Sequence, residues 1–363
     1  MKKDDLPVLN KSQRIEYIDA LRGFAMLLVV FCHINYFTFG VNGSSSLMVT
    51  TFSSFMLPLF FILSGFLAYK SELLLCNGKT LLVNVFKKFT VLVIPALVIG
   101  LIYTYFHSSR GADVFINNEM KMGYWFTFSL FQMFLIFYLI SYVTRKSSIK
   151  GNTKFCFVSL IIVAIFMYIA LSPIRRSQTM SRLADIICFA QTCEYFIFFV
   201  VGIIASKCRD TFFRILDNRY ISAIGIILFF LLLYYKYSLA GCYDSYIVEK
   251  FFTRVVPMLL GLLGAFISFN YFRIYENNFT RSTKLGSLLQ FIGKRTLDVY
   301  WLHYFFIPRI PSVGDFIIEN QSLIVEVSFV LVVAMIVVAF ALLLSSILRT
   351  SKFLGLILFG VKR

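Results

Sequence analysis

Charged residues, histidines and metal-binding motifs are scarce in this chain of 363 residues. Asp, Glu, Lys and Arg make up only 15% of the residues, and none of the three histidines belongs to an HxxxH or HExxH pair. The seven cysteines form no CxxC motif and no Cys/His cluster, and their odd number provides no disulfide framework. The sequence therefore gives little support to a zinc site, and we expect no metal.

The chain also lacks the features that separate soluble domains. It contains no long stretch rich in Pro, Gly or Ser, no repeat of fixed period and no low-complexity segment. Instead, 59% of its residues are hydrophobic and its mean hydropathy is +0.81, which excludes an ordinary soluble domain. Apolar runs of about 20 residues predict an all-α, polytopic membrane helical bundle with about ten transmembrane helices. The expected spans are residues 17–38, 47–69, 88–107, 124–143, 154–172, 184–206, 219–238, 252–272, 289–309 and 321–348.

Positive charge is unevenly distributed between the predicted loops. If the N-terminus is cytoplasmic, 25 of the 35 basic residues lie on the cytoplasmic side, nine lie outside, and Arg22 lies within the first span. This is the positive-inside pattern, so the net charge of +17 reflects topology and not a nucleic-acid partner. We expect both termini to be cytoplasmic, with residues 1–13 and 349–363 as tails and residues 14–348 as one membrane domain. The first apolar run lacks a cleavage site and is expected to be a retained span.

The first span carries ionisable residues at membrane depth. Its sequence from Arg14 to His33 is RIEYIDALRGFAMLLVVFCH. Arg22 and His33 are 11 residues apart, which places both on one helix face, about 16 Å apart along the axis. Asp19 is three residues before Arg22 and can pair with it. This pair could simply fix the depth of the helix, and His33 could be a neutral imidazole that bridges two helices. The functional interpretation is acid–base chemistry at His33.

Two further tracts combine small or basic residues with apolar spans. Ser64 and Gly65 lie in the FFILSGFL tract of the second span, where small residues favour close helix packing. The tract is not a GxSxG motif, so Ser64 is not assigned as a nucleophile. Lys87 and Lys88 open the third span. They could anchor that helix at the inner surface or bind the phosphates of a donor molecule.

The C-terminal part of the chain contains an irregular candidate span. Residues 285–295 are amphipathic, Thr296 is placed to cap the helix that follows, and the span could be short or partly re-entrant. This segment contains Tyr300 and His303, which could be part of an aromatic membrane belt or support the site. Glu194, in the sixth span, could pair with Arg22, orient a histidine, or be protonated and hydrogen-bonded within the bundle.

Together, these tracts resemble the acyltransferase-3 family of integral membrane acyltransferases. The first span matches the opening signature R-x4-D-x2-RG-x-A-x7-H, and residues 60–66 match the F-x2-SGF tract. Residues 86–95 are similar to the basic segment that ends in proline, although Leu92 replaces a second basic residue and lysines replace the arginines at 87 and 88. Residues 124–130, 198–202 and 293–303 resemble the W-F-x3-L, F-x2-G and G-K-x-S/T-L-x2-Y-x2-H elements.

The resemblance implies transfer of an acyl group, commonly acetyl from acetyl-CoA, to a hydroxyl of a glycan or lipid-linked sugar. Arg22, Lys87 and Lys88 would contact the acyl-CoA donor, and His33, with Arg22 and Asp19, would be catalytic. Ser64, Glu194, Tyr300 and His303 would contact substrate or support the site. Since no nucleophile is evident, direct transfer is favoured.

The chain resembles the stand-alone form of the family, and its composition suggests a bacterial cytoplasmic membrane. A transporter or flippase for a glycan-lipid or acyl donor is the alternative, and it predicts broken helices in matching halves of the chain. A non-catalytic scaffold would leave the alignment of Arg22 with His33 unexplained.

Overall fold

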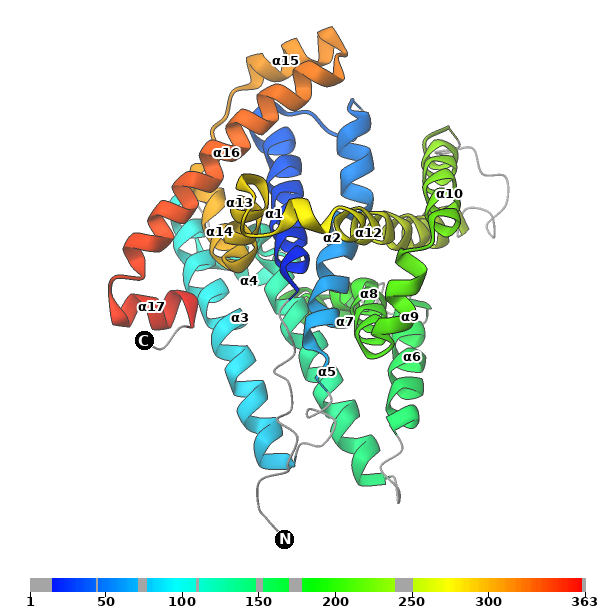
Figure 1. The fold of residues 1–363 in the computed structure, drawn as a ribbon. Helices are drawn as coiled ribbons and strands as arrows, with labels where there is room; N and C mark the ends of the chain where they lie inside the picture. The colour runs from blue at the N-terminus through cyan, green and yellow to red at the C-terminus, as the bar shows by residue number, and fades with distance from the viewer. Residues whose placement is uncertain are drawn as a thin grey trace.

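The computed structural model describes residues 15–43, 45–70, 77–108, 111–147, 153–169, 178–238 and 251–360 of the protein. Within these ranges it contains helices and no strand (Figure 1). The predicted N-terminal tail and Arg14 lie outside the described residues.

The longer helices are α1 (Glu16–Ile34), α2 (Leu47–Ala68), α3 (Gly78–His107), α5 (Trp125–Ser147), α6 (Thr153–Ile169), α8 (Phe189–Lys207), α10 (Arg219–Ser238), α12 (Val256–Ile274) and α16 (Leu323–Leu348). The shorter ones are η1 (Asn35–Phe39), α4 (Ala112–Asn117), η3 (Lys121–Gly123), α7 (Gln178–Ile186), α9 (Arg209–Leu216), η5 (Phe251–Val255), η6 (Glu276–Phe279), α13 (Lys284–Lys294), α14 (Thr296–Leu302), η7 (His303–Phe306), α15 (Pro311–Asn320) and α17 (Lys352–Phe359).

Eight of the described helices are long and apolar enough to cross a membrane, which confirms an all-α polytopic bundle. A shorter apolar helix covers Lys154–Ile169, within the predicted fifth span. The predicted ninth span, residues 289–309, is instead three short pieces: the end of α13, then α14 and η7. The helix breaks at Arg295, where φ is −118° and ψ is 25°. Arg295 is therefore the N-cap residue of α14, and the prediction that Thr296 caps this helix is wrong.

Glycines let α13 contact the backbone of α1 directly. A Cβ atom on Gly23 of α1 would overlap the carbonyl oxygen of Leu289, and one on Gly293 of α13 would overlap the carbonyl oxygen of Asp19. Only residues without side chains allow two helices to approach so closely. The contact places α14, which follows α13, beside the face of α1 that carries Arg22 and His33.

A second glycine pair joins α2 to α8. A Cβ atom on Gly65 would overlap the carbonyl oxygen of Phe199, and one on Gly202 would overlap that of Ile62. The packing interpretation of the Ser64–Gly65 tract is thus confirmed for the glycine. Gly65 holds α2 against α8, while the neighbouring Ser64 faces a cavity described below.

The buried carboxylate of Asp298 fixes α14 to the C-terminal end of α16. Arg349 donates to both oxygens of this carboxylate, from Nη2 at 2.7 Å and from Nε at 3.0 Å. The Ser345 hydroxyl donates a further hydrogen bond at 2.6 Å. Arg349 also lies 4.3 Å from the centre of the Phe359 ring in α17. The segment predicted as a C-terminal tail thus contains a helix, α17, that packs beside α3 (Figure 1).

Replacing Gly65 with alanine is expected to lower the stability of the protein by about 1–3 kcal/mol, because the new methyl group must push α2 away from α8. Gly225→Ala in α10 is the matched control, since its Cβ would meet the Phe266 ring at an ordinary 3.5 Å. Thermal unfolding of the purified proteins in one detergent compares them. Equal melting temperatures for the two variants would contradict the close α2–α8 contact.

Asp298→Ala is expected to destabilise the protein by about 3 kcal/mol, because it leaves Arg349 partly buried without its carboxylate. The double variant Asp298→Ala/Arg349→Ala should lose less than the sum of the two single variants, since neither charge then remains unpaired. A thermal-unfolding cycle of the four proteins measures this coupling. Additive losses would show that the ion pair does not join α14 to α16.

Candidate functional site

One face of α1 borders a cavity of about 280 Å³, which we call the Arg22 cavity. Helices α1, α2, α3, α5 and α14 all contribute to its wall. Most of the lining is apolar, and the polar groups are Arg22, Ser64, Lys88 and Thr296. Among the described residues that line it there is no carboxylate, so its polar wall is cationic.

Arg22 is fixed by groups on two helices. Its Nη2 atom donates to the hydroxyl of Thr296 at 3.2 Å, and its Nη1 atom lies 3.8 Å from Oδ1 of Asp19. The Asp19 side chain is 7% exposed and that of Arg22 is 28% exposed, so the guanidinium is the more accessible partner. Asp19 and Thr296 therefore orient a cation whose side chain lines the cavity.

Lys88 is the second cation of this cavity, and Lys87 is not. Lys88 is half-buried, with its Nζ atom 3.8 Å from the centre of the Phe134 ring. Lys87 is exposed and does not line the cavity. The two lysines point in different directions because consecutive helix residues differ by about 100°. The structure thus brings together Arg22 and one of the two lysines predicted to join it.

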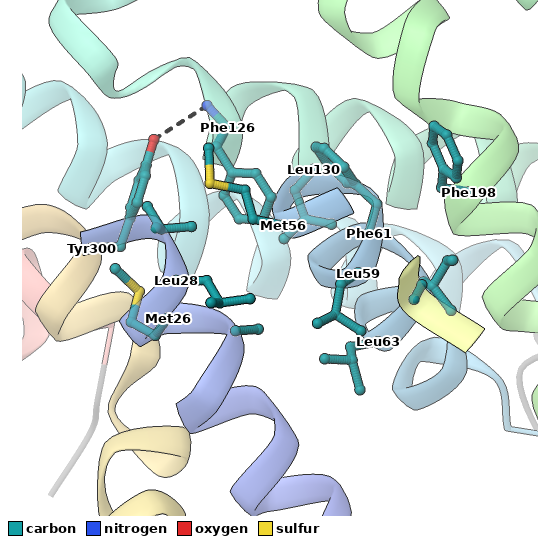
Figure 2. Packing of buried hydrophobic residues seen from close by; sticks show 14 of the residues in the cluster. Met26, Leu28, Met56, Leu59, Phe61, Leu63, Phe126, Leu130, Phe198 and Tyr300 are labelled. Atoms are coloured by element: carbon teal, nitrogen blue, oxygen red, sulfur yellow. Dashed lines mark hydrogen bonds between the residues drawn. The ribbon is translucent and has the colours of Figure 1, made fainter. Parts of the chain in front are cut away.

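A smaller cavity of about 30 Å³ continues along α1 beyond Arg22. Met26 and Val29, the next residues on this face, line it with Tyr300, and four residues of the wall are shared with the Arg22 cavity. Tyr300 is buried, and its hydroxyl donates to the carbonyl of Gly123 at 2.7 Å and accepts from the amide of Phe126 at 3.2 Å. Figure 2 shows Tyr300 and Phe126 joined in this way beside Met26. Tyr300 therefore lines the small apolar cavity that lies along the α1 face between Arg22 and His33.

His33 and His303 form a hydrogen-bonded pair at the other end of this face. Nδ1 of His33 is 2.9 Å from Nε2 of His303, and the two rings are inclined by only 8°. Nδ1 of His303 is 2.9 Å from the carbonyl oxygen of Val299. Since a carbonyl only accepts, His303 carries its proton on Nδ1 and, when neutral, accepts at Nε2. His33 then donates from Nδ1, which leaves a lone pair on its Nε2.

The two histidines differ in access. His303 is fully buried, whereas His33 is half-buried and carries the lone pair on Nε2. The π-helical turn η1 begins at Asn35, directly after this part of α1. Such wide turns occur frequently at functional sites. His33 is therefore the accessible base of the pair, and His303 selects its tautomer.

Tyr304 completes this end of the site, and sequence reasoning missed it. Its hydroxyl is 3.4 Å from Nε2 of His33, the nitrogen that carries the lone pair. The available signal was its position next to His303 at the end of the G-K-x-S/T-L-x2-Y-x2-H element. Thr296 was likewise misassigned as a cap, although it occupies the S/T position of the same element and binds Arg22.

Two predicted residues are placed apart from the histidines. Ser64 lines the Arg22 cavity, at the opposite end of the α1 face. Glu194 is exposed on α8, within electrostatic range of Tyr168 and Tyr195, and it lines neither of the two cavities.

A protein-family model described as an acyltransferase domain matches residues 15–345. No curated protein and no solved structure matches the chain. The matched range includes both cavities, the Arg22–Asp19 pair and both histidines of the hydrogen-bonded pair. The protein is thus an acyltransferase with several apolar helices suited to a membrane, and it belongs to the acyltransferase-3 family.

Proposed function

We propose that the protein is an O-acyltransferase that moves an acetyl group from acetyl-CoA to a hydroxyl of a cell-surface glycan or lipid-linked sugar. The observation that carries the proposal is the lone pair on Nε2 of His33, fixed by His303 on the α1 face that also holds Arg22. We place the enzyme in a bacterial cytoplasmic membrane, with the Arg22 end toward the cytoplasm as its charge distribution predicts.

The Arg22 cavity suits the phosphates of the donor. Arg22 and Lys88 supply two cations, and no described lining residue supplies a negative charge that would repel an anion. Hydrogen bonds between such cations and phosphate oxygens are strong in a partly buried site. Acetyl-CoA reaches this end from the cytoplasm, where it is made.

The apolar residues between Arg22 and His33 suit the rest of the donor. Arg22 and His33 are about 16 Å apart along the α1 axis, so a donor anchored at Arg22 must reach His33 by a long, thin arm. Met26, Val29 and Tyr300 line the narrow cavity between them. The pantetheine arm of acyl-CoA is extended and uncharged, and it would carry the thioester toward the histidine pair.

The chemistry at His33 is base-assisted attack on the thioester. Nε2 of His33 removes the proton of the acceptor hydroxyl as its oxygen attacks the thioester carbonyl carbon. The tetrahedral intermediate then expels the CoA thiolate, which takes the proton back from His33. The C–O bond of the ester replaces the C–S bond, and the products are the acetylated acceptor and CoA-SH.

Direct transfer agrees better with the geometry than an acyl-enzyme does. Ser64 carries a hydroxyl at the proposed donor end, and it lines the Arg22 cavity with Arg22 and Lys88. A serine nucleophile needs a base within hydrogen-bonding reach. His33 instead has its accessible nitrogen available to an acceptor.

His33→Ala is expected to lower the rate of acetyl transfer by about 10²–10⁴-fold, the usual contribution of a general base. His107→Ala is the control, because His107 is exposed at the end of α3 and bonds only locally, to the carbonyl of Tyr103. Mass spectrometry of surface polysaccharide and lipid-linked saccharides, from a deletion strain carrying each variant, measures ester-linked acetyl. Unchanged acetylation with His33→Ala, together with a loss of glycan export, would favour a transporter.

Arg22→Ala is expected to raise KM for acetyl-CoA by about 10–100-fold, as expected for the loss of charge-assisted hydrogen bonds. Lys88→Ala should raise it in the same direction, because Lys88 lines the same cavity. Lys87→Ala removes an adjacent lysine that is exposed and should change KM less than about twofold. CoA-SH release by the purified protein in lipid nanodiscs gives these constants. Equal effects at the two lysines would contradict the assignment of the cavity to the donor.

A further inference from the structure

We propose that Tyr304 is a catalytic residue that donates a hydrogen bond to the oxyanion formed during acyl transfer. The proposal rests on the proposed function. It assigns Tyr304 the second task that base-assisted acyl transfer requires, which is stabilisation of the negative charge on the former carbonyl oxygen.

The Tyr304 hydroxyl lies beside the reactive nitrogen of His33. It lies 3.4 Å from Nε2 of His33, beside the nitrogen that must receive the acceptor proton. An acceptor oxygen that replaces it there lies about 2.6–3.2 Å from Nε2. The thioester carbonyl carbon then lies one bond beyond the acceptor oxygen. Its carbonyl oxygen is within hydrogen-bonding reach of the Tyr304 hydroxyl once that hydroxyl has moved slightly aside.

The contact between the Tyr304 hydroxyl and His33 is weak. A distance of 3.4 Å is long for a hydrogen bond from a hydroxyl, for which about 2.7–2.8 Å is usual. The phenol of Tyr304 therefore loses little when an acceptor hydroxyl displaces it from His33. His303 is not suited to this task, because both of its ring nitrogens are already bonded, to Val299 and to His33.

The surrounding side chains fix the Tyr304 ring. Its centre lies 4.1 Å from that of His303, 5.1 Å from that of His33 and 5.4 Å from that of Tyr124. On another side it touches Gly123, where a Cβ atom would overlap the phenolic oxygen itself. Gly123 is thus the residue that leaves room for the Tyr304 hydroxyl.

The turn that carries Gly123 is strained and held in place. Lys121, Met122 and Gly123 have φ angles of 47°, 51° and 99°, a run of positive values that is costly for the two residues with side chains. Lys121 is 2% exposed, and its ammonium group donates to the carbonyls of Ile116, Asn118 and Asp185. The carbonyl of Gly123 accepts from Tyr300. Strain retained by this many bonds is typical of a functional site.

In the transfer step, Tyr304 keeps its own proton. His33 removes the acceptor proton, the acceptor oxygen bonds to the carbonyl carbon, and the C=O electron pair moves onto oxygen. The Tyr304 O–H donates to this oxyanion until the electron pair returns and the C–S bond breaks. The thiolate then takes the proton from His33, so tyrosine is unchanged at the end.

The test compares Tyr304→Phe with Tyr103→Phe. Both changes remove a hydroxyl from the same aromatic cluster, since the ring centres of Tyr103 and Tyr304 are 5.8 Å apart. Acetyl-CoA and glycolipid extracted from the deletion strain are the substrates, and the enzyme is in nanodiscs. Tyr304→Phe should lower kcat by about 10²–10³-fold, as the loss of an oxyanion donor does, with KM for acetyl-CoA within about twofold. Tyr103→Phe should keep kcat within about twofold.

The outcomes separate this proposal from the proposed function. If wild-type enzyme transfers acetyl and Tyr304→Phe has the same kcat, Tyr304 is not the oxyanion donor and the proposed function stands. If wild-type enzyme transfers no acyl group to any glycan fraction, the proposed function fails first. If Tyr304→Phe does not fold, Gly123→Ala serves instead, because its methyl group must displace the Tyr304 hydroxyl. An unchanged kcat in Gly123→Ala would overturn the proposal.

Discussion

The close contact between α1 and the broken α13–α14 segment is the constraint on which the candidate site depends. Gly23 and Gly293 let the backbones of α1 and α13 touch, and α14 then runs beside the functional face of α1. Side chains join the two segments at both ends of that face, through Arg22 with Thr296 and through His33 with His303. Any change in the angle of α14 would therefore move a cation partner and a histidine partner together.

The break at Arg295 lets α14 take a direction different from that of α13. Within α14 and its C-cap, Thr296 and His303 are seven residues apart and share the face toward α1, whereas Asp298 lies about 200° from Thr296 and meets α16. Asp298 pairs with Arg349, and His303 is hydrogen-bonded to the carbonyl of Val299 and to His33. Thr296, Asp298 and His303 thus each have the partner that a low-dielectric interior demands.

The sequence predicted the parts of the site that depend on one regular helix. Arg22 and His33 share a face of α1 because 11 residues complete about three turns, and this holds however the bundle packs. The charge of residues 87 and 88 was equally clear, but only packing decides that Lys88 faces the cavity and Lys87 does not. The sequence did not single out Tyr304, because aromatic residues near the end of a span are typical of a membrane belt. Only its contact with His33 shows that it belongs to the site.

The two ends of the site have opposite electrostatic requirements, and their separation meets both. The end proposed to bind phosphate must stay charged and reachable, and Arg22 remains 28% exposed beside a cavity. A general base must be neutral and poorly hydrated, and His33 lies among aromatic rings with its tautomer set by the fully buried His303. Were the ends adjacent, the positive charge of Arg22 and Lys88 would oppose protonation of His33 during transfer. About 16 Å of α1, along which Met26 and Val29 line a small apolar cavity, keeps these charges apart, and the proposed thioester donor is extended enough to span that distance.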